Sequence, residues 1–243
     1  MKNLLLIFIF ALVAISAKAD MTALEIVKAV DDKMDRTGAL SELEMKVYRS
    51  NKLRKTYQMH MKSEGDEKVL IDFLYPPRNK GEKYLKVEDS MWIYRPKINK
   101  TIRISGRSSF SGSDFSNTDI LSVRLDKDYI PTLLGTEKYA KGVAYKLELI
   151  AKSEEVTYAK IIYWVDKKQL VPLRRDFYTI SGHKLKTLLF ERQSRLFNEM
   201  PDTFIMSSVL EKNKKSVMHY RAFKGNQNFP AKTFRKSSLK KAR

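Results

Sequence analysis

The segment LRKTYQMHMK, residues 53–62, alternates between two kinds of side chain. Its odd positions are mostly apolar and include Met59 and Met61, whereas its even positions are hydrophilic. Successive side chains of a β-strand point to opposite faces of a sheet, so this period of two predicts a strand with one apolar face. The preceding segment SELEMKVYRS, residues 41–50, repeats the pattern, and the two residues between the segments predict a hairpin turn.

The rest of the chain places one helix before a long series of strands. The segment TALEIVKAVDDKMDR has apolar residues at helical spacing, and Thr22 with Glu25 matches a capping box, so we predict an amphipathic N-terminal helix. Short apolar segments bounded by turn residues predict further strands. Between KTIRIS and VAYKLELIA we expect a loop, a short helix from Asp119, and a break in the chain at Pro131 and Gly135.

Roughly twelve short strands, nearly all joined to the next by a turn, predict an antiparallel meander. A sheet of this size can hide its edges by bending, so we predict a mainly β (α+β) fold in which a strongly curved antiparallel sheet forms a barrel or half-barrel. A flat two-sheet sandwich is the alternative. The length supports one domain over residues 20–231, followed by a basic flexible tail over residues 232–243.

Residues 1–19 have the features of a signal peptide. Lys2 precedes an apolar run over residues 4–15, and Ala17-Lys18-Ala19 predicts cleavage after Ala19. The run is shorter than the roughly 20 residues of a membrane-spanning helix, although an uncleaved anchor is the alternative. We expect a soluble mature protein, because no later stretch could span a bilayer.

The chain contains no cysteine, which excludes lipoprotein acylation, disulfides and thiolate metal sites. Export without disulfides favours the periplasm of a double-membraned bacterium, and secretion beyond the cell stays open. The formal net charge of +19 predicts attraction to phospholipid head groups, lipopolysaccharide or nucleic acid, of which export makes nucleic acid the least expected. A generally basic proteome would explain the same charge. We expect an anionic membrane surface to contact Arg95, Lys97, Lys100 and Arg103.

Catalytic and metal-binding patterns are absent from the sequence. The three histidines, His60, His183 and His219, fall on separate predicted elements, and the motifs HExxH, GxSxG and the Walker loop do not occur. We therefore predict a protein that is not an enzyme and holds no metal or cofactor. A hydrolase with an unrecognised site is one competing interpretation.

Soft and aromatic side chains gather on the predicted strands. A sheet of about twelve strands can enclose more volume than one layer of side chains fills, and methionine adapts its shape to acyl chains. We therefore predict a hydrophobic cavity lined by Met45, Val47, Tyr57, Met59, Met61, Ile71, Phe73, Trp92, Tyr94, Phe177, Phe204 and Met206. A closed, filled core is the alternative for the same residues.

A lid is predicted from the N-terminal helix and from residues 105–121, where small glycine and serine residues accompany two phenylalanines. Large aromatic side chains in such a loop are expected either to pack on a core or to cover a hollow. The predicted lid residues are Leu24, Val27, Phe110, Phe115, Ile120 and Leu121.

Three segments, WIYRP (residues 92–96), RISG (103–106) and SGSDFS (111–116), resemble the signature of the LolA-like outer-membrane lipoprotein-sorting proteins. The segment WVDKKQLVPLRRDFYTISGHKL, residues 164–185, resembles a strand-turn-strand segment of the same family. The resemblance implies an unclosed antiparallel β-barrel with a helical lid, a hydrophobic cavity, no cofactor, and carriage of lipoprotein acyl chains or phospholipid through the periplasm.

The branch that the chain most resembles includes proteins encoded beside inner-membrane transporters of the resistance-nodulation-division type. The resemblance therefore makes such a transporter a candidate partner, and we expect a monomer that moves its cargo between membranes. A non-enzymatic sensor or adaptor of an envelope complex, with the same fold, is the other competing interpretation.

Overall fold

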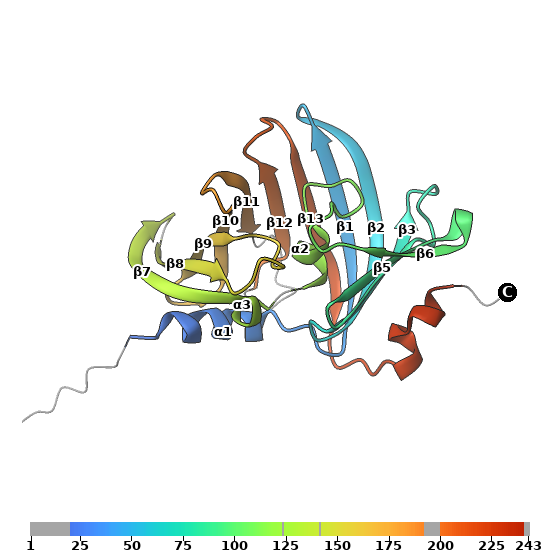
Figure 1. Cartoon of the computed structure of the whole chain (residues 1–243), viewed down its shortest axis with the longest axis horizontal. Coiled ribbons are helices and arrows are strands. Elements are labelled where there is room, and N and C mark those ends of the chain that lie inside the picture. Colours follow the sequence, from blue (N-terminus) through green and yellow to red (C-terminus); the bar gives the residue numbers. More distant parts are fainter. Residues whose placement is uncertain (1–19, 123, 141, 192–199, 241–243) are drawn as a thin grey trace, which may run out of the picture.

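The alternating segments form antiparallel strands, which make one thirteen-stranded sheet within the described part of the chain (Figure 1). This computed structural model describes residues 20–122, 124–140, 142–191 and 200–240. The predicted signal peptide, residues 1–19, lies outside the described residues. The strands are β1 (Ala39–Arg49), β2 (Lys52–Glu64), β3 (Lys68–Tyr75), β4 (Lys83–Val87), β5 (Ser90–Arg95), β6 (Lys100–Ile104), β7 (Tyr129–Tyr139), β8 (Gly142–Ala151), β9 (Lys160–Asp166), β10 (Pro172–Tyr178), β11 (Lys184–Glu191), β12 (Thr203–Ser208) and β13 (Lys215–Lys224).

Helices occupy the two ends and the middle of the chain. They are α1 (Ala23–Lys33), α2 (Asn117–Leu121), α3 (Leu125–Asp128) and the 3-10 helices η1 (Pro96–Ile98), η2 (Ala231–Phe234) and η3 (Lys236–Leu239). None of the helices in the described ranges has both the length and the apolar character that a transmembrane span requires.

The strand order is β6-β5-β4-β3-β2-β1-β13-β12-β11-β10-β9-β8-β7. Neighbours in this order are antiparallel, and β1 beside β13 is the one pair that joins strands distant in sequence. β6 and β7 stand at the two ends of the order, so the curved sheet is open between them (Figure 1). The predicted mainly β fold with a strongly curved, unclosed sheet is confirmed.

Helix α1 lays an apolar stripe against the rest of the protein. The Thr22 hydroxyl accepts the Glu25 N–H at 3.3 Å, and the Glu25 carboxylate accepts the Thr22 N–H at 2.8 Å, which completes the predicted capping box. Val27 and Val30 are fully buried. Leu24 is 51% exposed, because it lies outside this stripe on the first turn, so its assignment to the lid is wrong.

Strand β7 runs through Pro131 and Gly135, where the sequence predicts a break. The strand continues because β7 is an edge strand, in which every second backbone N–H has no neighbouring strand and a proline is tolerated. The β7–β8 register shifts between Leu133 and Gly135, and Gly135 takes a φ of +134°, a conformation that favours glycine.

A second apolar cluster lies on the face of β3–β5 that points away from the main core, and the C-terminal segment covers it. Phe234 and Leu239 are buried there against outward-facing side chains of the three strands. The segment over residues 232–243 is predicted as a flexible tail, but η2 and η3 pack on this cluster because its apolar side chains would otherwise face water. Residues 241–243 lie outside the described residues.

Phe234→Ala should lower the free energy of unfolding by roughly 3 kcal/mol, because it removes a buried ring and leaves a cavity. Urea unfolding followed by tryptophan fluorescence measures this, since Trp92 packs against the same cluster. Lys232→Ala, which truncates an exposed side chain of the same helix, is the control and should change little. Equal stability of the two variants would show that the C-terminal segment does not cover the sheet.

Candidate functional site

The concave face of the sheet brings most of the predicted cavity residues into one apolar cluster. Its buried members from that prediction are Met45, Val47, Tyr57, Met59, Met61, Ile71, Phe73, Phe177 and Met206. Phe204 is partly buried and packs against the cluster. These residues share a face because, within each strand, they occupy alternate positions.

Trp92 and Tyr94 are the exceptions among the predicted cavity residues. The neighbouring side chains of Met91 and Ile93 join the main cluster, whereas Trp92 and Tyr94 face the opposite way and pack in the cluster beneath the C-terminal segment. The prediction is wrong for these two aromatics because both faces of β5 are covered, so alternation does not distinguish the inner face from the outer one.

Residues 105–121, which we call the cover segment, lead from β6 along the concave face into α2 (Figure 1). The ring of Phe110 lies 4.6 Å from the ring of Tyr84 and 5.8 Å from the ring of Phe73, measured between centroids. Phe110, Phe115 and the α2 side chains of Ile120 and Leu121 belong to the same cluster as the strand residues. The predicted lid phenylalanines therefore fill the concave face in this structure.

Local sequence signals shape the cover segment. A Cβ atom on Gly106 would lie 2.4 Å from the Thr118 hydroxyl oxygen, so only glycine fits at this close approach. The Ser116 hydroxyl accepts the Asp119 N–H at 3.2 Å, and the Asp119 carboxylate accepts the Ser116 N–H at 2.7 Å. This second capping box starts α2 and directs Ile120 into the core.

Polar contacts hold the tip of the cover segment to three strands. The Asp114 carboxylate pairs with Arg49 of β1 at 2.8 Å and accepts a hydrogen bond from the Ser216 hydroxyl of β13 at 2.6 Å. The Asp114 carbonyl accepts a hydrogen bond from Lys186 of β11 at 2.7 Å. Water or a competing anion can replace such polar contacts, and the free-energy cost is lower than that of breaking buried apolar contacts.

Two arginines reach into the interior, and no sequence motif marks either of them. Arg36 is 6% exposed and donates to the Ile120 carbonyl at 3.4 Å and to the Tyr220 hydroxyl at 3.2 Å. The Arg175 guanidinium lies 4.6 Å from the centre of the Tyr163 ring. Within the described residues, Nε and Nη2 of Arg36 and Nε of Arg175 are buried without an acceptor. Such donors can bind a phosphate, carboxylate or ester oxygen of a guest.

Two small cavities lie in the described part of the interior. One cavity of about 40 Å³ is lined by both arginines together with Phe115 and Ile120 of the cover segment, and another of about 40 Å³ lies beside Arg175 and α3. Pockets for small ligands measure roughly 300–1,000 Å³, so neither cavity admits an acyl chain in this conformation. An open groove of about 660 Å³ lies elsewhere, along the β8–β9 and β10–β11 turns. An acyl chain that enters at either of these two cavities must therefore displace the cover segment.

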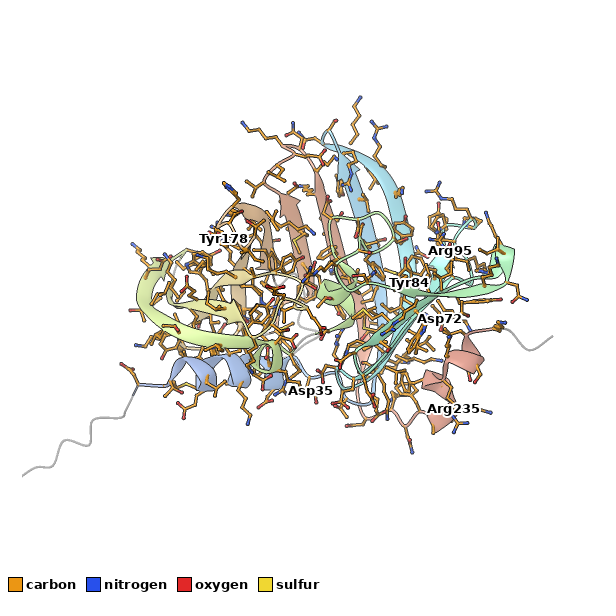
Figure 2. The ribbon with its side chains drawn as sticks, viewed as in Figure 1. Asp35, Asp72, Tyr84, Arg95, Tyr178 and Arg235 are labelled. Carbon is orange, nitrogen blue, oxygen red and sulfur yellow. The ribbon has the colours of Figure 1, made fainter. Side chains whose placement is uncertain are left out.

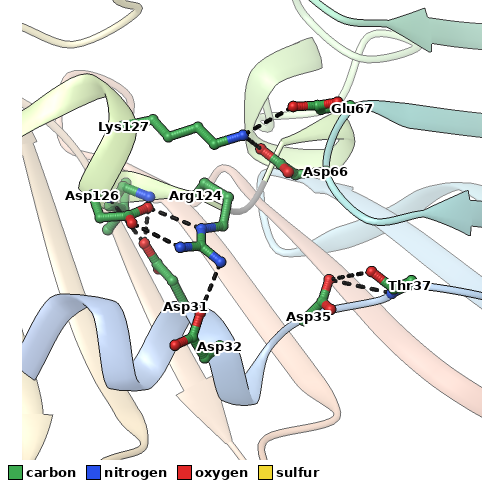
Figure 3. A network of polar contacts seen from close by, with 10 residues as sticks. Asp31, Asp32, Asp35, Thr37, Asp66, Glu67, Arg124, Asp126 and Lys127 are labelled. Carbon is green, nitrogen blue, oxygen red and sulfur yellow. Dashed lines mark hydrogen bonds and ion pairs between the residues drawn. The ribbon is translucent and has the colours of Figure 1, made fainter.

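Helix α3 joins α1 to the β2–β3 turn through charged side chains (Figure 3). Arg124 makes a bidentate pair with Asp126, with distances of 2.7 and 2.9 Å, and also pairs with Asp32 of α1 at 2.8 Å. On the other side, Lys127 pairs with Glu67 at 3.2 Å. This network fastens α3, which follows the cover segment, to α1 and to the β2–β3 turn.

Asp31 of α1 is a buried carboxylate in this network. One of its oxygens accepts the backbone N–H groups of Leu125 and Asp126 at 2.6 and 3.0 Å, whereas the other oxygen is buried without a partner among the described residues. Burial raises the pKa of Asp31 from 3.8 to about 7, and the positive charge of Arg175 opposes this shift.

The four predicted membrane-contact cations, Arg95, Lys97, Lys100 and Arg103, are exposed at and beside the β5–β6 turn. Arg95 forms a long ion pair of 3.8 Å with Glu82.

The histidines lie apart, as predicted: His60 on β2, His183 in the β10–β11 turn, and His219 on β13, where Nδ1 is 2.9 Å from the Thr203 hydroxyl. In the described ranges, no group of three His, Cys, Asp or Glu side chains could hold a metal ion.

A family model described as "Uncharacterized protein" matches residues 65–241, which is more than half of the chain. A LolA superfamily protein from Nitrosomonas europaea has the same fold, with a TM-score of 0.81 and 26% identity, and the match covers 90% of this chain and 100% of that one. The chain belongs to the LolA superfamily.

Two other solved structures are similar to the chain. A domain described as an outer membrane lipoprotein-sorting protein from Vibrio parahaemolyticus has a TM-score of 0.78 and 25% identity, over 89% of this chain and 97% of its own. A DUF1329 family protein from Desulfovibrio piger has a TM-score of 0.79 and 26% identity, over 90% of this chain and 98% of its own. No curated protein matches the chain. The LolA-like fold found here agrees with the family that the sequence resembles.

Asp31→Asn should flatten the pH dependence of stability. Because the pKa of Asp31 is raised in the folded state, the folded protein binds this proton more tightly than the unfolded chain does. The free energy of unfolding should therefore fall as the pH rises from about 4 to about 7, by a few kcal/mol at most, and this fall should be absent in the asparagine variant.

Urea unfolding at several pH values over that interval measures the slope. Asp32→Asn is the matched control, because it removes a carboxylate from the same helix turn without touching the N–H groups of α3. An unchanged slope in Asp31→Asn would contradict the assignment.

Proposed function

We propose that the protein is a periplasmic carrier that binds the acyl chains of a lipoprotein or phospholipid on the concave face of its sheet. One observation carries the proposal: an apolar concave face is closed by a segment whose tip is held by polar contacts around Asp114. Release of the tip would let the cover segment swing out. Acyl chains would then take the places of Phe110 and Phe115 on the concave face.

The energetics favour such an exchange. Burial of apolar surface contributes about 0.8 kcal/mol for each CH₂ group, so one acyl chain of about 16 carbons gains on the order of 10 kcal/mol. Part of this gain is offset by the contacts that the cover segment gives up. The methionines of the concave face, among them Met45, Met59 and Met61, can change rotamer to fit chains of different shape.

The interior arginines provide for the polar end of the same guest. In the closed protein, Arg36 and Arg175 bury N–H groups that have no acceptor among the described residues. A phosphate or ester oxygen entering with an acyl chain would satisfy them, which would add to the stability of the loaded state. No catalytic step is required for this function, and we propose none.

The proposed location and partners come from the sequence and the family. Export by the predicted signal peptide would deliver the domain that begins at Asp20 to the periplasm. A similar domain from Vibrio parahaemolyticus is described as an outer membrane lipoprotein-sorting protein, which supports transfer between membranes. We propose a monomer that receives its cargo from an inner membrane, with an inner-membrane transporter as the candidate donor.

A competing function is that of a sensor or adaptor acting through protein contacts. The packing of the cover segment on the concave face favours it, because the two cavities of about 40 Å³ among the described residues are too small for an acyl chain in the closed protein. The two functions differ in whether the cover segment opens to a lipid.

A cysteine pair should decide between them. Asp114→Cys with Ser216→Cys replaces two side chains that already touch at 2.6 Å, in a chain without native cysteine. We expect the reduced protein to bind a fluorescent fatty acid and the oxidised protein to bind at least about tenfold less, because the disulfide holds the cover segment shut.

The two single-cysteine variants, oxidised in the same way, are the controls and should bind like the reduced pair. Binding that is equal in both redox states would contradict entry beneath the cover segment. Absence of fatty-acid binding in every form, including the wild type, would favour the adaptor. This design is cleaner than truncating Phe110, whose removal also weakens the core.

A further inference from the structure

The turns at the two ends of the strands differ in charge. We call each row of turns an edge, as distinct from the edge strands β6 and β7. In an antiparallel meander, successive turns alternate between opposite edges. The β1–β2, β3–β4, β10–β11 and β12–β13 turns therefore share one edge, and we call these four turns the basic edge. The β5–β6 turn and the β8–β9 turn, which carries Glu154 and Glu155, lie on the same side of the sheet. The cations on and beside the four turns of the basic edge are Lys52, Arg54, Lys55, Arg78, Lys80, Lys184, Lys212, Lys214 and Lys215. Figure 2 shows nitrogen-bearing side chains projecting along this side of the molecule, at the top of the view.

Part of the opposite edge carries acidic groups. The β2–β3 turn supplies Asp66 and Glu67, and the β4–β5 turn supplies Glu88 and Asp89. The Glu88 N–H donates to the Glu67 carbonyl at 2.8 Å, so these two turns lie side by side. Helices α1 and α3 add further carboxylates there and bind this edge through Lys127 (Figure 3). The division of charge is therefore local to this part of the sheet, because the β7–β8 and β9–β10 turns on the same side carry the exposed cations Lys138, Lys167 and Lys168.

Large apolar side chains stand exposed among the cations of the basic edge. Leu210 in the β12–β13 turn is 76% exposed, Ile180 in the β10–β11 turn is 85% exposed, and Leu53 beside the β1–β2 turn is 51% exposed. Side chains on turn tips can enter a lipid interface without unfolding the strands that carry them. Exposed apolar groups ringed by lysine are typical of surfaces that bind anionic membranes.

These turns form a continuous surface. The Asn51 N–H of the β1–β2 turn donates to the Asn213 carbonyl of the β12–β13 turn at 3.2 Å. The Val209 N–H donates to the Leu185 carbonyl of β11 at 2.9 Å, which brings the β10–β11 hairpin alongside. Figure 1 shows the β1–β2 and β12–β13 turns at the top of the molecule, on the side opposite α1.

We propose that the basic edge docks on the surface of an anionic phospholipid bilayer. Leu210, Ile180 and Leu53 would enter the interface between head groups and acyl chains, and the surrounding lysines would contact lipid phosphates. The carboxylates of the β2–β3 and β4–β5 turns would be repelled by the same surface, which favours an orientation with the basic edge toward the bilayer.

This orientation has a consequence that rests on the proposed carrier function. The tip of the cover segment is fastened at the basic edge, where Asp114 pairs with Arg49 next to the β1–β2 turn. Docking would place this ion pair among lipid phosphates, which compete with Asp114 for Arg49. The cover segment would then open toward the bilayer that donates or receives the cargo.

Vesicle binding tests the docking surface. The variant Leu210→Ser with Lys212→Gln and Lys215→Gln removes one exposed leucine and two lysines from the basic edge. In co-sedimentation with vesicles containing phosphatidylglycerol, we expect its affinity to be about tenfold weaker or more, since each lysine near an anionic surface contributes measurably. Vesicles of phosphatidylcholine alone should bind the wild type far more weakly.

The matched control is Leu134→Ser with Lys138→Gln and Lys168→Gln, which removes the same groups from exposed positions away from the basic edge. It should bind like the wild type. Equal losses of affinity in both variants would show that only the overall charge matters, and would overturn the proposal. Failure of the wild type to bind anionic vesicles would also overturn it, and would favour a protein as the partner of the basic edge.

A third variant, Lys97→Gln with Lys100→Gln, tests the β5–β6 turn farther along the same sheet edge. A larger loss there than at Leu210 would overturn the assignment of the docking surface. The oxidised Asp114→Cys, Ser216→Cys protein, whose cover segment is shut, should still bind the vesicles. Docking is therefore measured independently of cargo, and its failure is distinguishable from failure of the carrier function.

Discussion

An apolar concave face that extends across the curved sheet cannot be left in water, and the arrangement of the other elements follows from its burial. Helix α1 contributes Val27 and Val30 to the cluster, and the cover segment contributes Phe110 and Phe115. The sheet itself is open between β6 and β7, so it cannot bury this face alone. The core of the protein is thus completed by a segment that is tied at its tip through Asp114, and the stability of the closed form depends on that segment remaining in place.

The interior also buries charge, which opposes the apolar burial. Arg36 and Arg175 bring donors into the core that lack acceptors among the described residues, and Asp31 brings an oxygen that lacks a donor. Buried polar groups of this kind cost free energy in the closed form. The two arginines line small cavities at the cover segment and α3, so a rearrangement that admits a polar guest there would relieve part of this cost.

Much of the architecture could be predicted from local patterns. The β1–β2 hairpin and the capping box at Thr22 depend on neighbouring residues, and the structure contains both. Predictions failed where a distant segment decides the environment: the face of Trp92 depends on the C-terminal helices that pack on β5, and the exposure of Leu24 depends on how α1 is rotated against the sheet. Pro131 is accommodated because β7 has no neighbour on one side, which no local pattern reveals.

The sequence by itself determined the period of two along the strands, the capping box at Thr22 and the order in which strands and cover follow one another, because each depends on side chains a few residues apart. Only the tertiary structure decided that the cover segment packs on the concave face, that Arg36 and Arg175 line one small cavity there, and that cations from separate turns share one edge of the sheet. These features depend on the pairing of β1 with β13 and on the curvature of the sheet, which bring together residues far apart in the chain.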